Sequence, residues 1–516
     1  MSQHNKIAYI YNPANQTYEE LVQNFVIRKK EFKKIFNEIV DVDLNCSAQH
    51  FLIEGQRGTG KTSLLLRLKY EIENSDNLNN LIAIQFAEES YNIFDLCRIW
   101  ESCAEILEDT DGFETISDEL ESMSDEDDYT KECFYIFEKY LIKNNKRLVL
   151  LLDNFGDILD KLSDIEQKRL RDIFHNSTYI QLITSSSRAL EHTYRHDKPF
   201  FEFFEIVKLS GLNKEETNIF LKQLSLTSNN NINKIIEEQP QRIETIRRLT
   251  GGIPRTIVLL FEIFLDNSAN VFEDLEIILD RVTPLYKHRM DDLPTKQQAI
   301  MDTIALNWDG ITTKEIVEKL KKRGFDTKSV SSQLKGLEKN DLVLSKNIDK
   351  KNKLYMIKER FFNIWYLMRL GRKKNKLQVQ WLVRFLEEWC KSNKTIGIGK
   401  DNNSKFLLSK KFLIDDKYQE SVDIIKELII SRKYINTVNE MIDYFIFLMA
   451  KKQYHLTYNL FKEFPDLKIQ FKPIYYTMLY FLKDEYPKEY LKMGEELEQT
   501  VEEILVEIEQ KAQKYN

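Results

Sequence analysis

The sequence has few of the residues that loosen or cross-link a chain. It holds 15 Gly and 9 Pro in 516 residues, so long flexible linkers are not expected. The five cysteines form no C-x-x-C pair, which argues against a zinc site and against a disulfide framework. We therefore expect reduced thiols in or near a core: Cys46, Cys97, Cys103, Cys133 and Cys390.

Long apolar runs are also missing. The longest, such as Tyr444 to Ala450, fall far short of the ~20 residues that span a bilayer. The first residues, Met1 to Lys6, lack the apolar core of a signal peptide. These absences predict a cytoplasmic location and no membrane partner.

Neither sign of charge dominates. Charged residues make up 30% of the chain and the net charge is -7. This balance argues against a nucleic-acid coat over the whole molecule but leaves room for one basic module. The 42% of hydrophobic residues can form packed cores, and the length fits about three domains of roughly 150 residues.

What the chain does contain is a complete phosphate-binding loop pattern. Residues Gly55 to Thr62 read Gly-Gln-Arg-Gly-Thr-Gly-Lys-Thr and match G-x-x-x-x-G-K-[S/T]. An apolar run precedes the loop, and helix formers follow it. Glycines let the backbone point N–H groups at an anion, and a helix N-terminus adds positive potential. We expect Lys61 to reach the outer phosphates and the Thr62 hydroxyl to join a Mg²⁺ shell.

Short apolar runs alternate with helical patterns from Phe51 to about Leu209. Such alternation predicts a parallel sheet covered by helices. The predicted strands are Phe51–Ile53, Leu81–Ile84, Leu148–Leu152, Tyr179–Ile183 and Ile206–Leu209.

The end of the third predicted strand supplies a carboxylate. Asp153 follows Leu152 directly and is the predicted second Mg²⁺ residue. The next residue is Asn154, where an acid usually orients the attacking water. An amide positions water but cannot take its proton, which favours slow hydrolysis. Assistance from another acid, Asp157, is the alternative.

The end of the fourth predicted strand is rich in hydroxyls. Thr184 or Ser185 is the candidate to sense the γ-phosphate between the two nucleotide-binding strands. Arg188 follows, either as a residue that reaches the phosphates or as a surface arginine.

A helical region from Asn213 to about Leu265 is interrupted by Gly251-Gly252-Ile253-Pro254. This element is either a simple turn or a lid that places Ile253 and Pro254 against the adenine ring. Its position after a phosphate loop and a polar strand end favours the lid.

The next segment predicts a winged helix. Three helical patterns (Lys296 to Leu306, from Thr312, and Lys328 to Asn340) precede an alternating stretch that ends at Ile357 and reads as a β-hairpin. Lys328 and Lys335 lie on the predicted recognition helix and Lys346 on the wing, as suits DNA phosphate contacts. The alternative is a module that packs on the ATPase core and binds no nucleic acid.

The remainder of the chain predicts helices only. Stacked hairpins of the TPR type and a plain bundle both fit, because no clean repeat period is present. The predicted domains are an N-terminal segment and helix at 1–49, an ATPase core at 50–210, a helical lid at 211–290, a winged helix at 291–371 and an all-helical region at 372–516.

Taken in order, these motifs resemble one superfamily. Phe25 to Arg28, the loop, Asp153-Asn154, the strand end at Thr184, and Thr250 to Arg255 before a winged helix resemble the STAND branch of AAA+-related P-loop ATPases. The chain is similar to the archaeal-type ATPase family in particular. The resemblance covers roughly Phe25 to Leu370 and leaves the helical tail outside.

The resemblance implies an α/β P-loop NTPase core with an ASCE-type parallel sheet, a helical lid, a winged helix and an all-α C-terminal region. It also implies ATP or ADP with Mg²⁺, nucleotide-controlled assembly as a homo-oligomer or with a separate effector protein, and Arg28 and Pro254 near the base. The implied nucleotide-binding residues are Arg28, Gly55, Gln56, Arg57, Gly58, Thr59, Gly60, Lys61, Thr62, Ser63 and Pro254. The implied catalytic residues are Lys61, Asp153, Asn154, Thr184 and Arg188, with Thr62 and Asp153 at the metal.

Three functions fit this sequence. The first is an ATP-binding switch with slow hydrolysis, which by analogy of fold points to prokaryotic stress or antiphage defence. The second is a DNA-binding AAA+ ATPase of the origin-recognition or transposition-targeting type. The third is a scaffold whose nucleotide is never hydrolysed, an alternative that Asn154 keeps open.

Overall fold

The structure is a computed structural model. Two compact units make up the chain, one of Met1–Asn231 with Ile253–Phe261, the other of Ile232–Gly252 with Glu262–Asn516. The described residues are 16–41, 47–86, 93–124, 129–187, 193, 196, 198–228, 233–258, 271–291, 293–339, 342–349, 352–390, 404–431 and 438–515.

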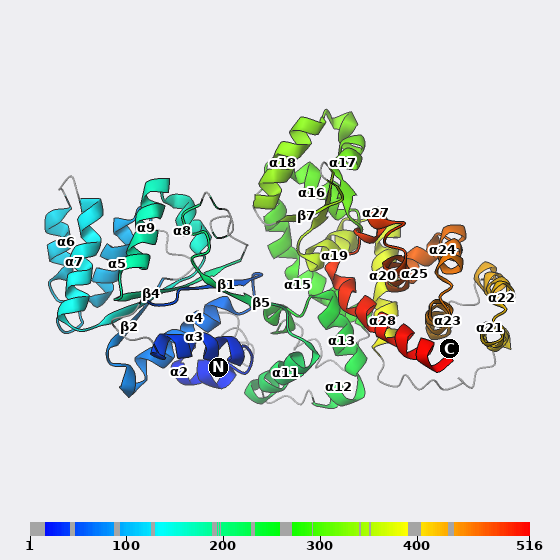
Figure 1. Ribbon diagram of the computed structural model, residues 1–516, viewed down its shortest axis with the longest axis horizontal. Helices are drawn as coiled ribbons and strands as arrows, with labels where there is room; N and C mark the ends of the chain where they lie inside the picture. Colours follow the sequence, from blue (N-terminus) through cyan, green and yellow to red (C-terminus); the bar gives the residue numbers. More distant parts are fainter. Residues whose placement is uncertain are drawn as a thin grey trace. The chain divides into compact units, whose positions relative to one another are not determined.

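The first unit is built on a five-stranded parallel sheet (Figure 1). Its strands are β1 (Phe51–Gly55), β2 (Leu81–Phe86), β3 (Arg147–Leu152), β4 (Ile180–Ser186) and β5 (Glu205–Leu209). The strand order is β2-β3-β4-β1-β5. All five predicted strands are confirmed. Because β4 pairs with both β1 and β3, the carboxyl ends of these three strands are neighbours.

Helices cover both faces of this sheet, which is why its central strands are almost entirely apolar. In β3, Leu148, Leu150 and Leu152 point into one core, while Val149 and Leu151 point into the other. Figure 1 shows the helices on the two sides. On one side lie α2 (Tyr18–Asn24), α3 (Lys29–Asp41) and α4 (Lys61–Glu73), followed by the short η2 (Asp76–Leu78). On the other lie α5 (Cys97–Leu107), α6 (Ile116–Met123), α7 (Tyr129–Lys143), α8 (Phe155–Lys161) and α9 (Asp164–Asn176).

The predicted lid is divided between the units. The helix after β5, α11 (Lys214–Ser228), belongs to the first unit. The second unit begins with α12 (Asn233–Glu238), α13 (Pro240–Leu249) and α15 (Val271–Asp291). The Pro at the first position of α13 suits a helix start, because that N–H has no partner within the helix.

Next in the second unit come three helices and a small sheet, in the order that the sequence predicted. They are α16 (Thr295–Ala305), β6 (Ile311–Thr312), α17 (Thr313–Leu320), η3 (Lys321–Arg323), α18 (Thr327–Lys339), β7 (Val343–Asn347) and β8 (Lys353–Ile357). The sheet order is β6-β8-β7, and β7 and β8 are the predicted hairpin. We call this segment the helix–hairpin module.

The rest of the second unit is helical in its described residues, which confirms the predicted all-α region. Its helices are α19 (Arg360–Arg369), α20 (Lys373–Trp389), α21 (Ser404–Ile414), α22 (Tyr418–Ile430), α23 (Val438–Ala450), α24 (Tyr454–Glu463), α25 (Asp466–Gln470), α26 (Lys472–Phe481), α27 (Pro487–Tyr490) and α28 (Glu495–Tyr515). The last helix runs back against α23 and α26. No described helix is long and apolar enough to cross a membrane.

Candidate nucleotide site

The glycine loop between β1 and α4 has the backbone of an anion cradle. Gly58 and Gly60 have φ angles of 88° and 99°, which glycine adopts at little steric cost. Gly60 is the N-cap of α4, and a Cβ placed there meets no atom within 4 Å. The space above the helix N-terminus is therefore open to a ligand, as phosphate binding requires.

Gly55 is needed for a different reason. A Cβ at this position would lie 2.6 Å from Thr59 Oγ1 and 2.9 Å from the Leu209 carbonyl oxygen. Only a glycine lets the start of the loop pack this closely against the end of β5. The Thr59 hydroxyl donates to the Gln56 carbonyl oxygen at 2.8 Å and so closes the loop on itself.

The Lys61 side chain lies at this loop. Its Nζ donates to the carbonyl oxygens of Gly55 at 2.8 Å and Gln56 at 3.2 Å, and the residue is buried. These contacts hold a full positive charge beside the N-terminus of α4, where anions are already favoured.

The two predicted metal residues are in direct contact. Thr62 Oγ1 donates to Asp153 Oδ2 at 2.5 Å, although the two are 91 positions apart in the chain. Hydroxyl and carboxylate oxygens are the ligands that Mg²⁺ prefers. Among the described residues no group of three His, Cys, Asp or Glu side chains could hold a metal. A Mg²⁺ ion at this pair would therefore complete its shell with phosphate oxygens and water.

The hydroxyls at the end of β4 are used in two different ways. Thr184 Oγ1 donates to the Leu152 carbonyl oxygen at 2.7 Å and so ties β4 to β3. Ser185 Oγ donates to Asp153 Oδ1. Of the two candidates, it is thus Ser185 that contacts the predicted metal carboxylate, and Thr184 serves the sheet.

Asn154 has an unusual backbone conformation. Its φ of 54° and ψ of 52° lie in the left-handed region, and it is the N-cap of α8. Asn and Asp enter this region far more readily than other residues with a side chain. Its backbone N–H points at Asp153 Oδ1, 3.2 Å away. The left-handed backbone of this turn thus favours a short polar side chain such as Asn at position 154.

The lid element reaches the phosphate loop within the first unit. Arg255 N donates to the Gly58 carbonyl oxygen at 3.2 Å. A Cβ on Gly58 would lie 2.8 Å from Arg255 Cβ and 3.2 Å from Ile253 Cγ2. Pro254 is buried between them in sequence, and Arg255 is exposed. Arg255, a basic residue directly after the glycine–proline element, is among the further positively charged candidates that the sequence offers.

Arg28 is buried next to Ser210, the residue that follows β5. Its guanidinium donates to the Ser210 carbonyl oxygen and pairs with Glu31 Oε1 at 3.8 Å. Burial lowers the pKa of Arg28, and the charges of Glu31 and Glu216 oppose that shift. In the described residues its Nε has no hydrogen-bond acceptor. A buried donor of this kind fits the polar edge of a ligand.

The remaining predicted residues are placed as follows. Gln56 and Ser63 are half-buried in the loop and at the start of α4, and Arg57 is exposed. Arg188 lies outside the described residues. Of the three lysines predicted for DNA, Lys328 and Lys335 are exposed on α18. Lys346 instead donates to the Met493 carbonyl oxygen at 3.1 Å, so its ammonium is engaged within the second unit.

Comparisons with known proteins find distant similarity to several solved structures. No protein-family model matches the chain, and no curated protein sequence matches it. A Walker-type ATPase of Pyrococcus abyssi is 16% identical, with a TM-score of 0.44 over 66% of this chain and 95% of that one. The ORC2 protein of Aeropyrum pernix, in ADPNP and ADP complexes, is 14% identical, with a TM-score of 0.44 over 65% and 90%. The Thermotoga maritima RuvB branch migration motor is 14% identical, with a TM-score of 0.32 over 64% and 92%.

Similarity at this distance does not indicate the function of this chain. The fold of the core rests on this chain's own features: a parallel sheet in the order β2-β3-β4-β1-β5, a glycine loop between β1 and α4, and Asp153 at the end of β3. These features are those of a P-loop NTPase.

Proposed function

We propose that this chain is an ATP–Mg²⁺-binding switch of the AAA+ type with slow hydrolysis, in which the bound nucleotide sets conformation or assembly. The observation that carries the proposal is the hydrogen-bonded set of Thr62 in the first turn of α4, Asp153 directly after β3, and Ser185 at the end of β4. It joins the phosphate loop to the strand ends that a nucleotide triphosphate and its metal would occupy.

Binding in this proposal uses charge and backbone together. The N–H groups around Gly58 and Gly60 and the N-terminus of α4 receive the phosphates, and Lys61 adds a full positive charge. Thr62 and Asp153 offer oxygens to Mg²⁺. Arg28 and Pro254 would lie toward the base.

Slow hydrolysis follows from Asn154. Its amide can orient a water molecule but cannot accept the proton that the attacking water must lose. Asp157, the alternative acid, lies in the first turn of α8 and is exposed. The nucleotide is then held for long periods, as suits a switch.

The finer assignment to the STAND branch is supported by the glycine–proline element. Ile253 and Arg255 lie on the phosphate loop at Gly58, and the chain runs from them straight back through Gly252 and Gly251 to α13. If nucleotide displaces this segment, the displacement would reach the second unit along the covalent chain.

The proposal is tested by Lys61→Ala in the full chain. We expect ATP affinity to fall by about 100-fold or more, because about 3 kcal/mol of charge-assisted contacts is lost. Lys69→Ala is the matched control: Lys69 lies on the same helix but pairs with Glu73, away from the loop. Isothermal titration measures both affinities. Equal ATP affinity for Lys61→Ala and Lys69→Ala would refute the proposal.

A second candidate is the DNA-binding AAA+ ATPase. The observation that favours it is a cluster of exposed cations on the helix–hairpin module, which has the element order of a winged helix. In the described residues none of them forms an ion pair: Lys314, Lys321, Lys322, Arg323, Lys328 and Lys335. Free cations on and beside a recognition helix suit DNA phosphates.

A further inference from the structure

The last helix of the chain, α28, is bound to several other parts of the second unit. Toward its N-terminal end, Glu496 accepts from Arg360 at 2.8 and 3.0 Å and from Trp308 Nε1 at 2.8 Å. Near its C-terminal end, Lys511 forms an ion pair with Asp443 of α23. Both contacts are far from the nucleotide site in sequence, and neither belongs to a motif that the sequence offers.

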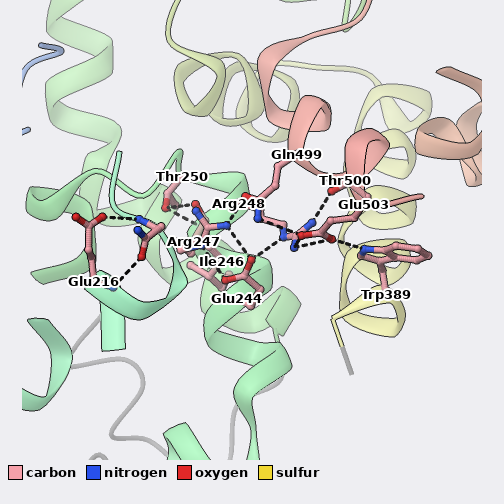
Figure 2. A network of polar contacts seen from close by, with 11 residues as sticks. Glu216, Glu244, Ile246, Arg247, Arg248, Thr250, Trp389, Gln499, Thr500 and Glu503 are labelled. Atoms are coloured by element: carbon pink, nitrogen blue, oxygen red, sulfur yellow. Dashed lines mark hydrogen bonds and ion pairs between the residues drawn. The ribbon is translucent and has the colours of Figure 1, made fainter. Parts of the chain in front are cut away.

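Between these ends, α28 binds the helix that precedes the lid element (Figure 2). Arg248 of α13 donates to Thr500 Oγ1 at 2.8 Å and to Glu503 Oε1 and Oε2 at 2.8 and 3.0 Å. Arg247 donates to Gln499 Oε1 at 2.6 Å. Two consecutive arginines at the end of α13 are thus held by one face of α28.

Two carboxylates share these arginines, one within α13 and one on α28. Glu244 of α13 accepts from both Arg247 and Arg248, and Glu503 also accepts from Trp389 Nε1 of α20 at 2.7 Å. Burial by itself raises the pKa of Glu503, but the hydrogen bond and the charge of Arg248 outweigh it and hold the pKa below its ordinary value. The pair with Arg248 is therefore ionised at neutral pH.

The end of α13 is also fastened to the glycine turn. Gly252 N donates to the Arg247 carbonyl oxygen at 2.8 Å, and Gly251 N donates to that of Arg248 at 3.3 Å. The residues whose side chains α28 holds are thus the residues whose carbonyls hold the turn. The next residue, Ile253, begins the segment that contacts Gly58.

We propose that α28 is a coupling helix: through the contacts of Arg248 with both Thr500 and Glu503 it makes α13, the helix–hairpin module and the C-terminal helices move together when nucleotide displaces the segment Ile253–Arg255. The second unit then responds to nucleotide as one body. This inference rests on the proposed switch function and adds the route by which the switch reaches the C-terminal region.

The test is hydrogen–deuterium exchange of the full chain, with and without a slowly hydrolysed ATP analogue. Glu503→Gln removes the charge and keeps the shape of the side chain. Glu502→Gln is the matched control, because it makes the same change at an exposed neighbour. In wild type and in Glu502→Gln we expect the analogue to change exchange in the loop, in α13, and in α20 and α28.

In Glu503→Gln we expect the change in the loop and in the segment Ile253–Arg255 to remain, and the change in α20 and α28 to be lost. A full change in α20 and α28 of this variant overturns the coupling. So does wild-type protein in which the analogue changes the loop but never α28. Absence of analogue binding in wild type instead refutes the proposed function itself, so the two failures are distinguishable.

A second variant covers the case in which Glu503→Gln unfolds the C-terminal helices. Thr500→Val removes the acceptor of Arg248 Nη1 without a change of shape. We expect it to reduce the change in α20 and α28 while both helices stay protected from exchange. An undiminished change there overturns the proposal.

Discussion

At the scale of single residues, the proposal of slow hydrolysis depends on Asn154. The sequence identified it as an amide in place of an acid, and the structure supplies a reason for a short side chain: a left-handed backbone at the start of α8. In the proposed switch, slow hydrolysis would follow from this missing base, while Lys61 contacts the loop and Thr62 contacts Asp153.

We predict that Asn154→Asp raises the rate of phosphate release. Aspartate tolerates the same backbone conformation and adds a base, which contributes roughly 10²–10⁴-fold where geometry is favourable. The matched control is Asn145→Asp, because Asn145 has a φ of 51° and lies before the other end of β3. Steady-state phosphate release measures both variants. If both release phosphate at the wild-type rate, the missing base is not what limits turnover.

At the residue level, the loop and Asp153 could be proposed from the sequence because short motifs mark them, and the contact of Thr62 with Asp153 agrees with that proposal. The choice between Thr184 and Ser185 was beyond the sequence, since neighbouring residues of a strand point to opposite faces and only the register with β3 decides which one meets Asp153. The sequence also contains no signal that predicts the positive φ angle of Arg28.

At the scale of elements, strands and helices followed their hydrophobic periods. The five strands of the sheet and the hairpin of the helix–hairpin module lie where apolar alternation predicted them. The contacts of α28 could not be predicted from its sequence, because a helix rich in glutamate is typical of a solvent-exposed surface. Only long-range pairing shows that Glu496 and Glu503 meet buried arginines.

The helix–hairpin module gives a prediction at this scale. If α18 contacts DNA, the double variant Lys328→Ala, Lys335→Ala should weaken binding and reduce the slope of log affinity against log salt by about 1.8. Lys346→Ala should leave the slope unchanged, because that ammonium already binds the Met493 carbonyl. Fluorescence anisotropy at several salt concentrations measures the slopes. A wild-type chain that binds no DNA at low salt removes this candidate.

At the scale of the whole molecule, one of the boundaries between the two compact units falls directly after the glycine turn. Ile253–Phe261 belongs to the unit with the phosphate loop, and Ile232–Gly252 belongs to the unit with the C-terminal helices. The sequence predicted five domains in a row and could not predict that the lid would be divided between two units. In the proposed switch, a nucleotide-induced change in the first unit would reach the second unit at this point of the chain.

The most direct test of this account is small-angle X-ray scattering coupled to size exclusion, which reports mass and radius of gyration together. We predict that wild-type protein with ADP differs from wild-type protein with a slowly hydrolysed ATP analogue in at least one of the two quantities. Lys61→Ala should give the same profile with either nucleotide. Superimposable wild-type profiles at saturating ADP and analogue would contradict a nucleotide-controlled switch.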